Sequence, residues 1–275
     1  MQSIIGHSKQ KKYFEKAVKN GDLEHAYIFA GPDAIGKKKF ALEIYVQANK
    51  SIFGLDPDLK IVLSDGSSIG IDEAREIKNF FSLSAHAGPY RFLIIDDAHM
   101  LTVEASNALL KIIEELPKSA VIILVSSKPA LLLDTVKSRC HTVNFHSQSP
   151  EEIETYLSSR KLSQNDKDFI LKISGKRIGK AISIIEKNII EEIKKSILEF
   201  KKVLGMGDFE KIQYAKKLSD AGNYGDIIED CINYFSADFQ NNRKILKGLL
   251  GLHRILSQPQ YNHKLAIENF LINIQ

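Results

Sequence analysis

Apolar and polar positions along the first 145 residues alternate in a way that predicts strands separated by helices. The runs that predict strands are 26–30 (AYIFA), 60–63 (KIVL), 91–96 (RFLIID), 120–125 (AVIILV) and 141–145 (HTVNF). The helices predicted around them are one capped by Ser8 and ended by Gly21, one carrying Phe40 and Ile44, one capped by Asp72, and one from Thr102 to about Glu115. Apolar strands that alternate with helices predict a parallel sheet covered on both faces.

After residue 147 the strand pattern stops and helical periodicity takes over. Ser149, Pro150 and Glu152 form a capping box with proline at the first helical position. The helices predicted beyond this point are 150–160, 164–174, 178–187, 189–204, 208–220, 223–240, 243–256 and 263–273. The sequence therefore predicts α/β followed by all-α, with an α/β domain at 1–147, a small helical domain at 148–188 and a C-terminal helical domain at 189–275.

Composition and charge limit the classes of function. The chain has 275 residues, a net charge of +4 and two cysteines, Cys140 and Cys231, which form no C-x-x-C pair. Neither a metal site nor a disulfide framework is predicted. The N-terminus lacks the apolar core of a signal peptide and no apolar run is long enough to span a bilayer, so we expect a cytoplasmic protein without a membrane partner.

A glycine-rich loop follows the first predicted strand. Gly31, Gly36 and Lys37 have the spacing G-x-x-x-x-G-K of a phosphate-binding loop, in which backbone N–H groups and a helix N-terminus face the anion. The next residue is Lys38, where a nucleotide-binding loop has a Ser or Thr that ligates magnesium. A strand-to-helix turn without a ligand is the alternative interpretation.

Three further positions fit a P-loop protein, although each also has an ordinary explanation. Asp96 and Asp97 follow the third strand, where a metal-binding and a catalytic carboxylate are found, but the pair could simply cap the next helix. Ser127 follows the fourth strand, where a polar residue can sense a γ-phosphate or merely end the strand. Arg139 precedes the fifth strand in a turn, where an arginine is most often a surface charge.

Taken together, the order and spacing of these segments resemble the clamp-loader branch of the AAA+ ATPases. The segments are HAYIFAGPDAIGKKKFAL, SIGIDEAREIKNFF, YRFLIIDDAHMLTVEASNALLKIIEELP and SRC. Within that branch the chain is most similar to the delta-prime subunits of bacterial DNA polymerase III, over about residues 1–187. The resemblance implies an AAA+ P-loop domain, a small helical lid domain and a C-terminal oligomerisation collar.

The resemblance also implies a division of labour between subunits. Arg139 matches an arginine that reaches the ATP bound by a neighbouring motor subunit. Lys38, Asp97 and the Gly179–Lys180 pair depart from active relatives at the magnesium ligand, the catalytic glutamate and the second phosphate sensor. We therefore expect a subunit that does not hydrolyse ATP. Its vestigial nucleotide site, empty or weak, comprises Gly31, Gly36, Lys37, Asp96, Asp97 and Ser127. No cofactor is expected, since residues 47–63 lack the cysteines of the family's zinc module.

The partners implied by the resemblance are the gamma/tau motor subunits, the delta subunit and primer–template DNA, with the sliding clamp as a further candidate. Arg75, Lys78 and Lys111 are basic residues on predicted helices that could contact DNA, or could form an ordinary solvated face. The alternative functions are an active gamma-like ATPase, which Lys38 argues against, and an adaptor or helicase-loading module, which would not need Arg139 at an interface.

Overall fold

The computed structural model describes residues 4–50, 56–64, 68–258 and 260–274. The chain forms two compact units, the first running to Glu152 and including Arg177–Gly179, the second comprising Ile153–Lys176 and the chain from Lys180 onward. The predicted lid and collar helices thus fall mostly in one unit. Their division at residue 188 stays a prediction.

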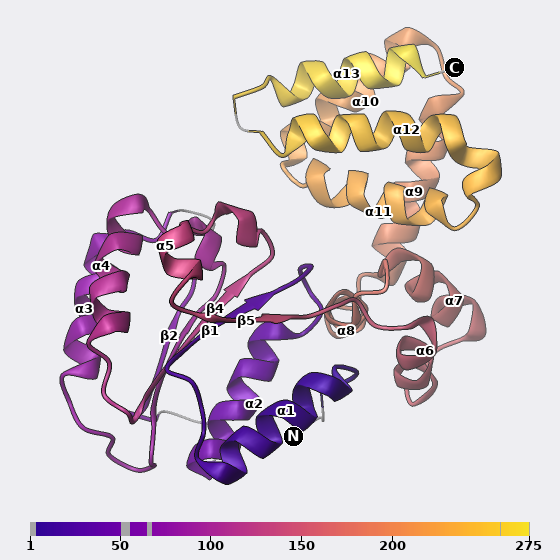
Figure 1. Ribbon diagram of the computed structural model, residues 1–275. Coiled ribbons are helices and arrows are strands. Elements are labelled where there is room, and N and C mark those ends of the chain that lie inside the picture. The colour runs from indigo at the N-terminus through magenta and orange to yellow at the C-terminus, as the bar shows by residue number, and fades with distance from the viewer. Residues whose placement is uncertain (1–3, 51–55, 65–67, 259, 275) are drawn as a thin grey trace. The chain divides into compact units, whose positions relative to one another are not determined.

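The first unit is built on a five-stranded parallel sheet (Figure 1). Its strands are β1 (Ala26–Ala30), β2 (Leu59–Val62), β3 (Arg91–Ile95), β4 (Ala120–Ser126) and β5 (His141–Asn144). They lie in the order β2-β3-β4-β1-β5, and every neighbouring pair is parallel. The predicted parallel sheet is confirmed.

Helices cover both faces of this sheet, as the sequence predicts. Those of the first unit are α1 (Ser8–Asn20), α2 (Lys37–Asn49), α3 (Ile71–Phe81), α4 (Val103–Glu114) and the short α5 (Asp134–Lys137), with 3₁₀ turns at Ala98–Met100 and Pro129–Leu131. Neighbouring residues of β1 belong to the cores on the two different faces of the sheet. Phe29 packs with Phe14 of α1 and Phe40 of α2. Ile28 packs on the other face, with Leu109 of α4. Each face therefore has its own apolar core.

Several predicted boundaries are wrong by one or two residues. Ser8 is the first residue of α1 rather than its cap, since His7 before it adopts a left-handed conformation. Asp72 lies inside α3, where the carboxylate of Glu73 accepts a hydrogen bond from the Gly70 N–H at 3.1 Å. The expectation of strands buried throughout holds for β1, β3 and β4, while the sheet edges β2 and β5 are partly exposed.

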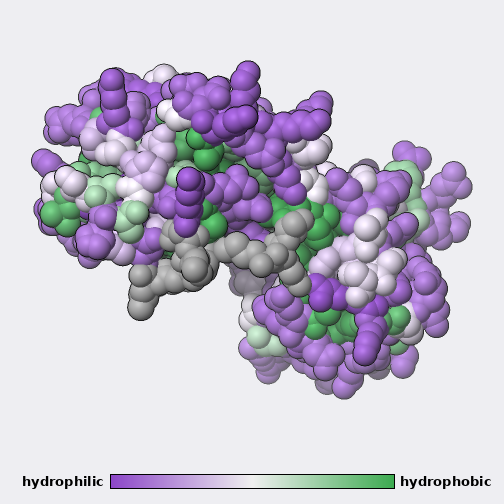
Figure 2. All heavy atoms as spheres, turned by 90° about the horizontal axis from the view of Figure 1, so that it is seen from below, coloured by the Kyte–Doolittle hydropathy of each residue, from purple (hydrophilic) through white to green (hydrophobic). Residues whose placement is uncertain are grey.

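The second unit is helical, and both α6 and α8 start in residues assigned to the first. Its helices are α6 (Pro150–Ser158), α7 (Gln164–Ile173), α8 (Ile178–Glu186), α9 (Ile190–Leu204), α10 (Asp208–Ala221), α11 (Tyr224–Ser236), α12 (Phe239–Leu256) and α13 (His263–Asn273). The break predicted between 240 and 243 lies instead at Ala237–Asp238. Asp238 precedes α12 there, and its carboxylate and carbonyl accept hydrogen bonds from the side-chain amides of Asn241 and Asn242. Hydrophilic side chains dominate the face drawn in Figure 2, and apolar ones reach it in separate small groups.

A fully buried carboxylate holds the connection between α3 and β3. Asp58 accepts hydrogen bonds from the backbone N–H groups of His86, Ala87 and Gly88 at 2.7–3.2 Å. The guanidinium of Arg91, also buried, lies 3.8 Å from the same carboxylate. Buried charges need such partners: Asp58 is the acceptor for the three backbone N–H groups and the counter-charge of Arg91, whose terminal nitrogens donate to the Ser84 and Pro57 carbonyls.

Replacing Asp58 by alanine should lower the free energy of unfolding by about 3 kcal/mol or more, because it leaves buried N–H donors without their acceptor and the buried Arg91 guanidinium without its counter-charge. Urea denaturation followed by circular dichroism measures this change. Asp72→Ala is the matched control: that carboxylate forms only an exposed pair with Arg75, and its loss should cost about 1 kcal/mol or less. Equal effects of the two substitutions would contradict the assigned role of Asp58.

Candidate functional site

The predicted site residues gather where three parallel strands end at one edge of the sheet. Ala30 of β1 pairs with Ser126 of β4, and Ile95 of β3 pairs with Leu124 of β4, so the three strands finish almost level. Gly31, Asp96 and Ser127 are the residues that follow β1, β3 and β4. Ser127 is half-buried beyond β4.

The loop between β1 and α2 has the backbone of a phosphate-binding loop. Gly31 (φ 154°) and Gly36 (φ 97°) have positive φ angles, and so does Ala34 (φ 57°). A Cβ on Gly31 would collide with the carbonyl oxygen of Phe145, so only glycine fits there. The Gly31 N–H donates to the Ser126 carbonyl at 3.2 Å, which ties the start of the loop to β4.

Lys37 turns its ammonium group into the loop itself. Its Nζ donates to the carbonyl oxygens of Gly31 at 2.7 Å and Pro32 at 2.5 Å, and the side chain is buried. Burial lowers the pKa of Lys37, while the carboxylates of Asp33, Asp96 and Asp97 act in the opposite direction. Asp33 is a member of this cluster that the sequence interpretation missed, although it lies within the loop.

The side chain at the usual hydroxyl position forms an ion pair across the site. The ammonium nitrogen of Lys38 lies 3.1 Å from Oδ2 of Asp96, and both side chains are partly buried. Asp97, next along the chain, has a left-handed backbone, and burial followed by the nearby Asp96 charge raises its pKa. The carboxylate that would hold a metal therefore already has a cation beside it.

Contacts from distant segments hold the far side of the loop. The Ile35 carbonyl accepts hydrogen bonds from Nε2 of His7 at 2.8 Å and from the side-chain amide of Gln148 at 2.9 Å. The Gly179 N–H donates to the Ala34 carbonyl at 2.6 Å. His7 and Gln148 were not predicted, because single polar residues far apart in sequence give no periodic or spacing signal.

Arg139 lies apart from this cluster, in the turn between α5 and β5. Its Nε donates to the carboxylate of Glu114, at the end of α4, at 2.7 Å, and one terminal nitrogen donates to the Thr135 carbonyl at 3.2 Å. About 40% of the side chain is exposed. The arginine is therefore accessible, and its contacts are an exposed ion pair, the Thr135 carbonyl and, at 3.5 Å, the Ser138 hydroxyl.

The other predicted residues have separate environments. Arg75 and Lys78 lie on α3 and Lys111 on α4, all three exposed. Lys180, proposed at the second sensor, forms an ion pair with Asp230 of α11 at 2.6 Å. The ammonium of Lys180 is thus engaged within the helical unit.

The described residues include no group of three or more His, Cys, Asp or Glu side chains placed to hold a metal ion. Cys140 is half-buried, and burial raises the pKa of its thiol to about 12. Residues 51–55, part of the segment expected to lack a zinc module, lie outside the described residues, so that expectation stays a prediction.

Across the described ranges, no helix has both the length and the apolar character needed to cross a bilayer.

The His7 contact predicts a pH-dependent stability. Burial lowers the pKa of His7 below its ordinary value of about 6.5. At pH values between the lowered pKa of His7 in the folded protein and its ordinary pKa in the unfolded chain, the unfolded chain binds more protons than the folded one. The free energy of unfolding therefore falls as the pH drops through this window. His7→Asn keeps a residue that tolerates the left-handed backbone but does not titrate. Urea titrations at about pH 7.5 and 5.5 should show a smaller acid-induced loss for this variant than for the wild type, and equal losses would contradict the prediction.

Sequence comparisons place the chain among replication proteins. The model of a family described as "DNA polymerase III, delta subunit" matches residues 46–149. The delta' subunit of DNA polymerase III from Bacillus subtilis (strain 168) is 27% identical over 213 residues, 70% of this chain and 63% of that protein. The gamma/tau subunit from Mycobacterium tuberculosis (strain ATCC 25618 / H37Rv) is 29% identical over 173 residues, 56% of this chain. The chain thus spans 30% to 63% of the length of these two relatives.

A structural comparison agrees on the fold. A DNA polymerase III gamma subunit-related protein from Thermotoga maritima superimposes with a TM-score of 0.60 at 20% sequence identity, covering 94% of this chain and 97% of the other. A RuvB variant from the same organism matches 72% of this chain with a TM-score of 0.51. The fold is therefore of the AAA+ type. With the family match over residues 46–149 and the related sequences, the chain is therefore similar to the delta-prime and gamma/tau subunits of bacterial DNA polymerase III.

Proposed function

We propose that this chain is a delta-prime-type subunit of a sliding-clamp loader, does not hydrolyse ATP itself, and supplies Arg139 to the ATP site of a neighbouring motor subunit. The identities to delta' and gamma/tau relatives, 27% and 29%, do not separate the two kinds of subunit. The choice between them rests on the residues of the site.

The ion pair between Lys38 and Asp96 is the observation that carries the proposal. A magnesium–nucleotide complex needs a hydroxyl at position 38 and a free carboxylate at position 96 to hold the metal. Here an ammonium group with a single positive charge lies 3.1 Å from that carboxylate. The residues present do not fit a magnesium ion, and without it the charge on the transferred phosphate would lack its main counter-charge.

Two other parts of the site support the same conclusion. A catalytic base must keep its carboxylate ionised and within hydrogen-bond reach of the attacking water. Asp97 is one methylene shorter than the usual glutamate, which shortens its reach towards that water. Lys180, the cation nearest to the second sensor position, is paired with Asp230 and Glu229.

Arg139 has the properties that a trans-acting arginine needs. Its guanidinium is partly exposed, and its ion pair with Glu114 is of the solvent-exposed kind that contributes little to stability. Exchanging Glu114 for a phosphate oxygen of a neighbouring subunit would therefore cost little. An arginine supplied in this way offsets the charge that develops on the transferred phosphoryl group.

The helical unit offers surfaces for assembly with other loader subunits. Phe209 and Ile212 on α10 and Leu265 on α13 are exposed by 69%, 42% and 60%. Exposed apolar side chains on neighbouring helices are typical of subunit interfaces. This supports the gamma/tau and delta subunits as partners. Primer–template DNA and the clamp stay predicted partners.

The trans role predicts the effect of Arg139→Ala on a loader reconstituted with its motor and delta subunits. ATP turnover in the presence of clamp and primer–template DNA should fall by roughly 10³-fold at the site that Arg139 serves. Arg139→Lys should restore only part of the activity, because lysine lacks the planar fork of donors. Glu114→Ala, which removes only the resting partner, is the matched control and should leave turnover close to that of the wild type.

Unchanged turnover with Arg139→Ala would reject the trans role and leave a scaffold or an adaptor module. Assembly of each variant is checked by size-exclusion chromatography, so a loss of activity cannot be confused with a loss of the complex.

The metal-site argument predicts a gain of function for Lys38→Thr in the isolated chain. The substitution frees Asp96 and restores a hydroxyl, so binding of a fluorescent ATP analogue should become stronger and dependent on magnesium. Lys39→Thr, one position along α2, is the matched control for the loss of a lysine and should have no such effect. Magnesium-dependent binding by the wild type that equals the binding by Lys38→Thr would contradict the assigned role of Lys38.

A further inference from the structure

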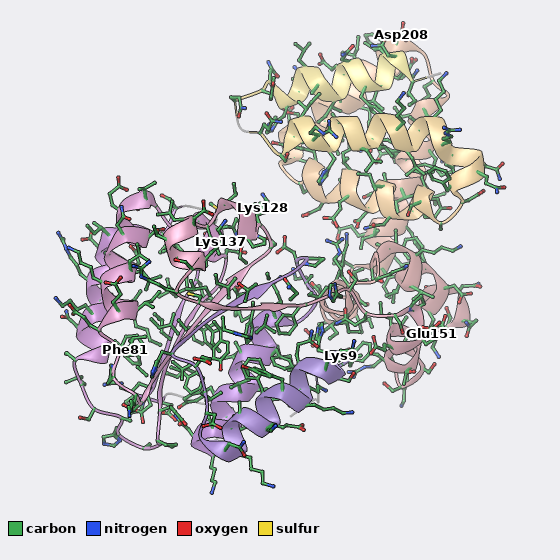
Figure 3. The ribbon with its side chains drawn as sticks, in the orientation of Figure 1. Lys9, Phe81, Lys128, Lys137, Glu151 and Asp208 are labelled. Carbon is green, nitrogen blue, oxygen red and sulfur yellow. The ribbon has the colours of Figure 1, made fainter. Side chains whose placement is uncertain are left out.

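A groove between α3 and α4 combines an apolar floor with positive charge. It is a hollow of about 530 Å³ in the first unit. Its apolar lining includes Phe81, Ala108, Ile112 and Leu116, and its basic lining is Arg75, Lys78 and Lys111. Phe81 lies at the end of α3, on the side of the sheet that this helix covers (Figure 3). These residues form the α3–α4 groove.

The two helices begin side by side, which sets the levels of their side chains. Ile69 and Leu101 form an isolated parallel bridge just before them, and the Thr102 N–H donates to the Ile69 carbonyl at 3.0 Å. Lys78 comes seven residues after the start of α3 and Lys111 eight residues after the start of α4. Both lie about two helical turns from the common starting point, so the two lysines line the groove at a similar level.

The charges along the groove are not balanced at this level. Within the described residues, neither Lys78 nor Lys111 makes an ion pair, whereas Arg75 pairs with Asp72 at 2.9 Å. The acidic residues of the lining, Glu104 and Glu115, lie near the two ends of α4. Two like charges facing one hollow repel each other, and an anion placed between them would remove that repulsion.

We propose that the α3–α4 groove binds an acidic, amphipathic peptide segment of a partner protein. Its carboxylates pair with Lys78 and Lys111, and an apolar side chain covers Phe81, Ala108 and Ile112. The hollow has room for a few side chains, as grooves that bind peptides through spaced anchors require. Duplex DNA is the less favoured ligand, because its phosphates need cations but leave an apolar floor uncovered.

Fluorescence anisotropy with the full chain at low ionic strength tests the proposal. The probe is a short labelled peptide in which four aspartates flank a Leu-Phe pair. Two control peptides replace either the aspartates by asparagine or the Leu-Phe pair by serines. A labelled primer–template duplex is titrated in parallel. The protein variant is Lys78→Glu/Lys111→Glu, with Lys9→Glu/Lys16→Glu on the exposed side of α1 as the control of equal net charge.

The proposal predicts that the acidic Leu-Phe peptide binds the wild-type chain saturably. Its binding should be at least about tenfold weaker for Lys78→Glu/Lys111→Glu and unchanged for the α1 control. Both control peptides should also bind at least about tenfold more weakly. Equal binding of the serine peptide would overturn the proposal, since the apolar floor would then play no part. Binding of the duplex alone, lost in the same variant, would overturn it in favour of DNA. Circular dichroism confirms that each variant is folded.

Discussion

The ion pair between Lys38 and Asp96 is the interaction on which the account of this protein depends. It exists because parallel strands end at one edge of a sheet, which brings the start of α2 next to the end of β3. The same edge gathers Asp33, Asp96 and Asp97, whose negative charges need a counter-charge. In an active P-loop protein a magnesium ion supplies part of it. Here two lysines lie among the three carboxylates, so the chain itself supplies most of the counter-charge.

The loop that carries these lysines is held by protein groups on both sides. Lys37 binds the carbonyls of Gly31 and Pro32 from within. His7, Gln148 and Gly179 bind the carbonyls of Ile35 and Ala34 from outside. Backbone carbonyls that are satisfied in this way favour a fixed loop, and this conformation requires no ligand. In the proposed function this α/β fold acts as a support, while Arg139 lies in a separate turn where a neighbour could reach it.

The sequence predicted those features whose signal lies in one segment. The apolar runs of β1, β3 and β4 are unambiguous because both faces of these strands are covered, and the convergence of Gly31 and Asp96 follows from a parallel sheet. The replacement of the usual hydroxyl by Lys38 was also visible in the sequence.

Features that depend on distant segments could not be predicted. Nothing near His7 in the sequence indicates the Ile35 carbonyl that it binds 28 residues later, and the same holds for Gln148, 113 residues from Ile35. The pairing of Arg139 with Glu114 and the engagement of Lys180 by Asp230 are likewise long-range contacts. The break at Ala237–Asp238 was misplaced because residues 236–240 contain neither glycine nor proline, so the sequence has no strong stop signal there.

The central claim is that Lys38 occupies the position of the magnesium ion beside Asp96, and that the chain therefore does not turn over ATP. The most direct measurement is steady-state ATP hydrolysis by the purified wild-type chain, with magnesium and with saturating ATP, beside the same protein carrying Lys37→Ala. The account predicts that neither protein hydrolyses ATP above the rate in buffer alone. Robust, magnesium-dependent turnover that disappears in Lys37→Ala would contradict it and would identify an active motor subunit.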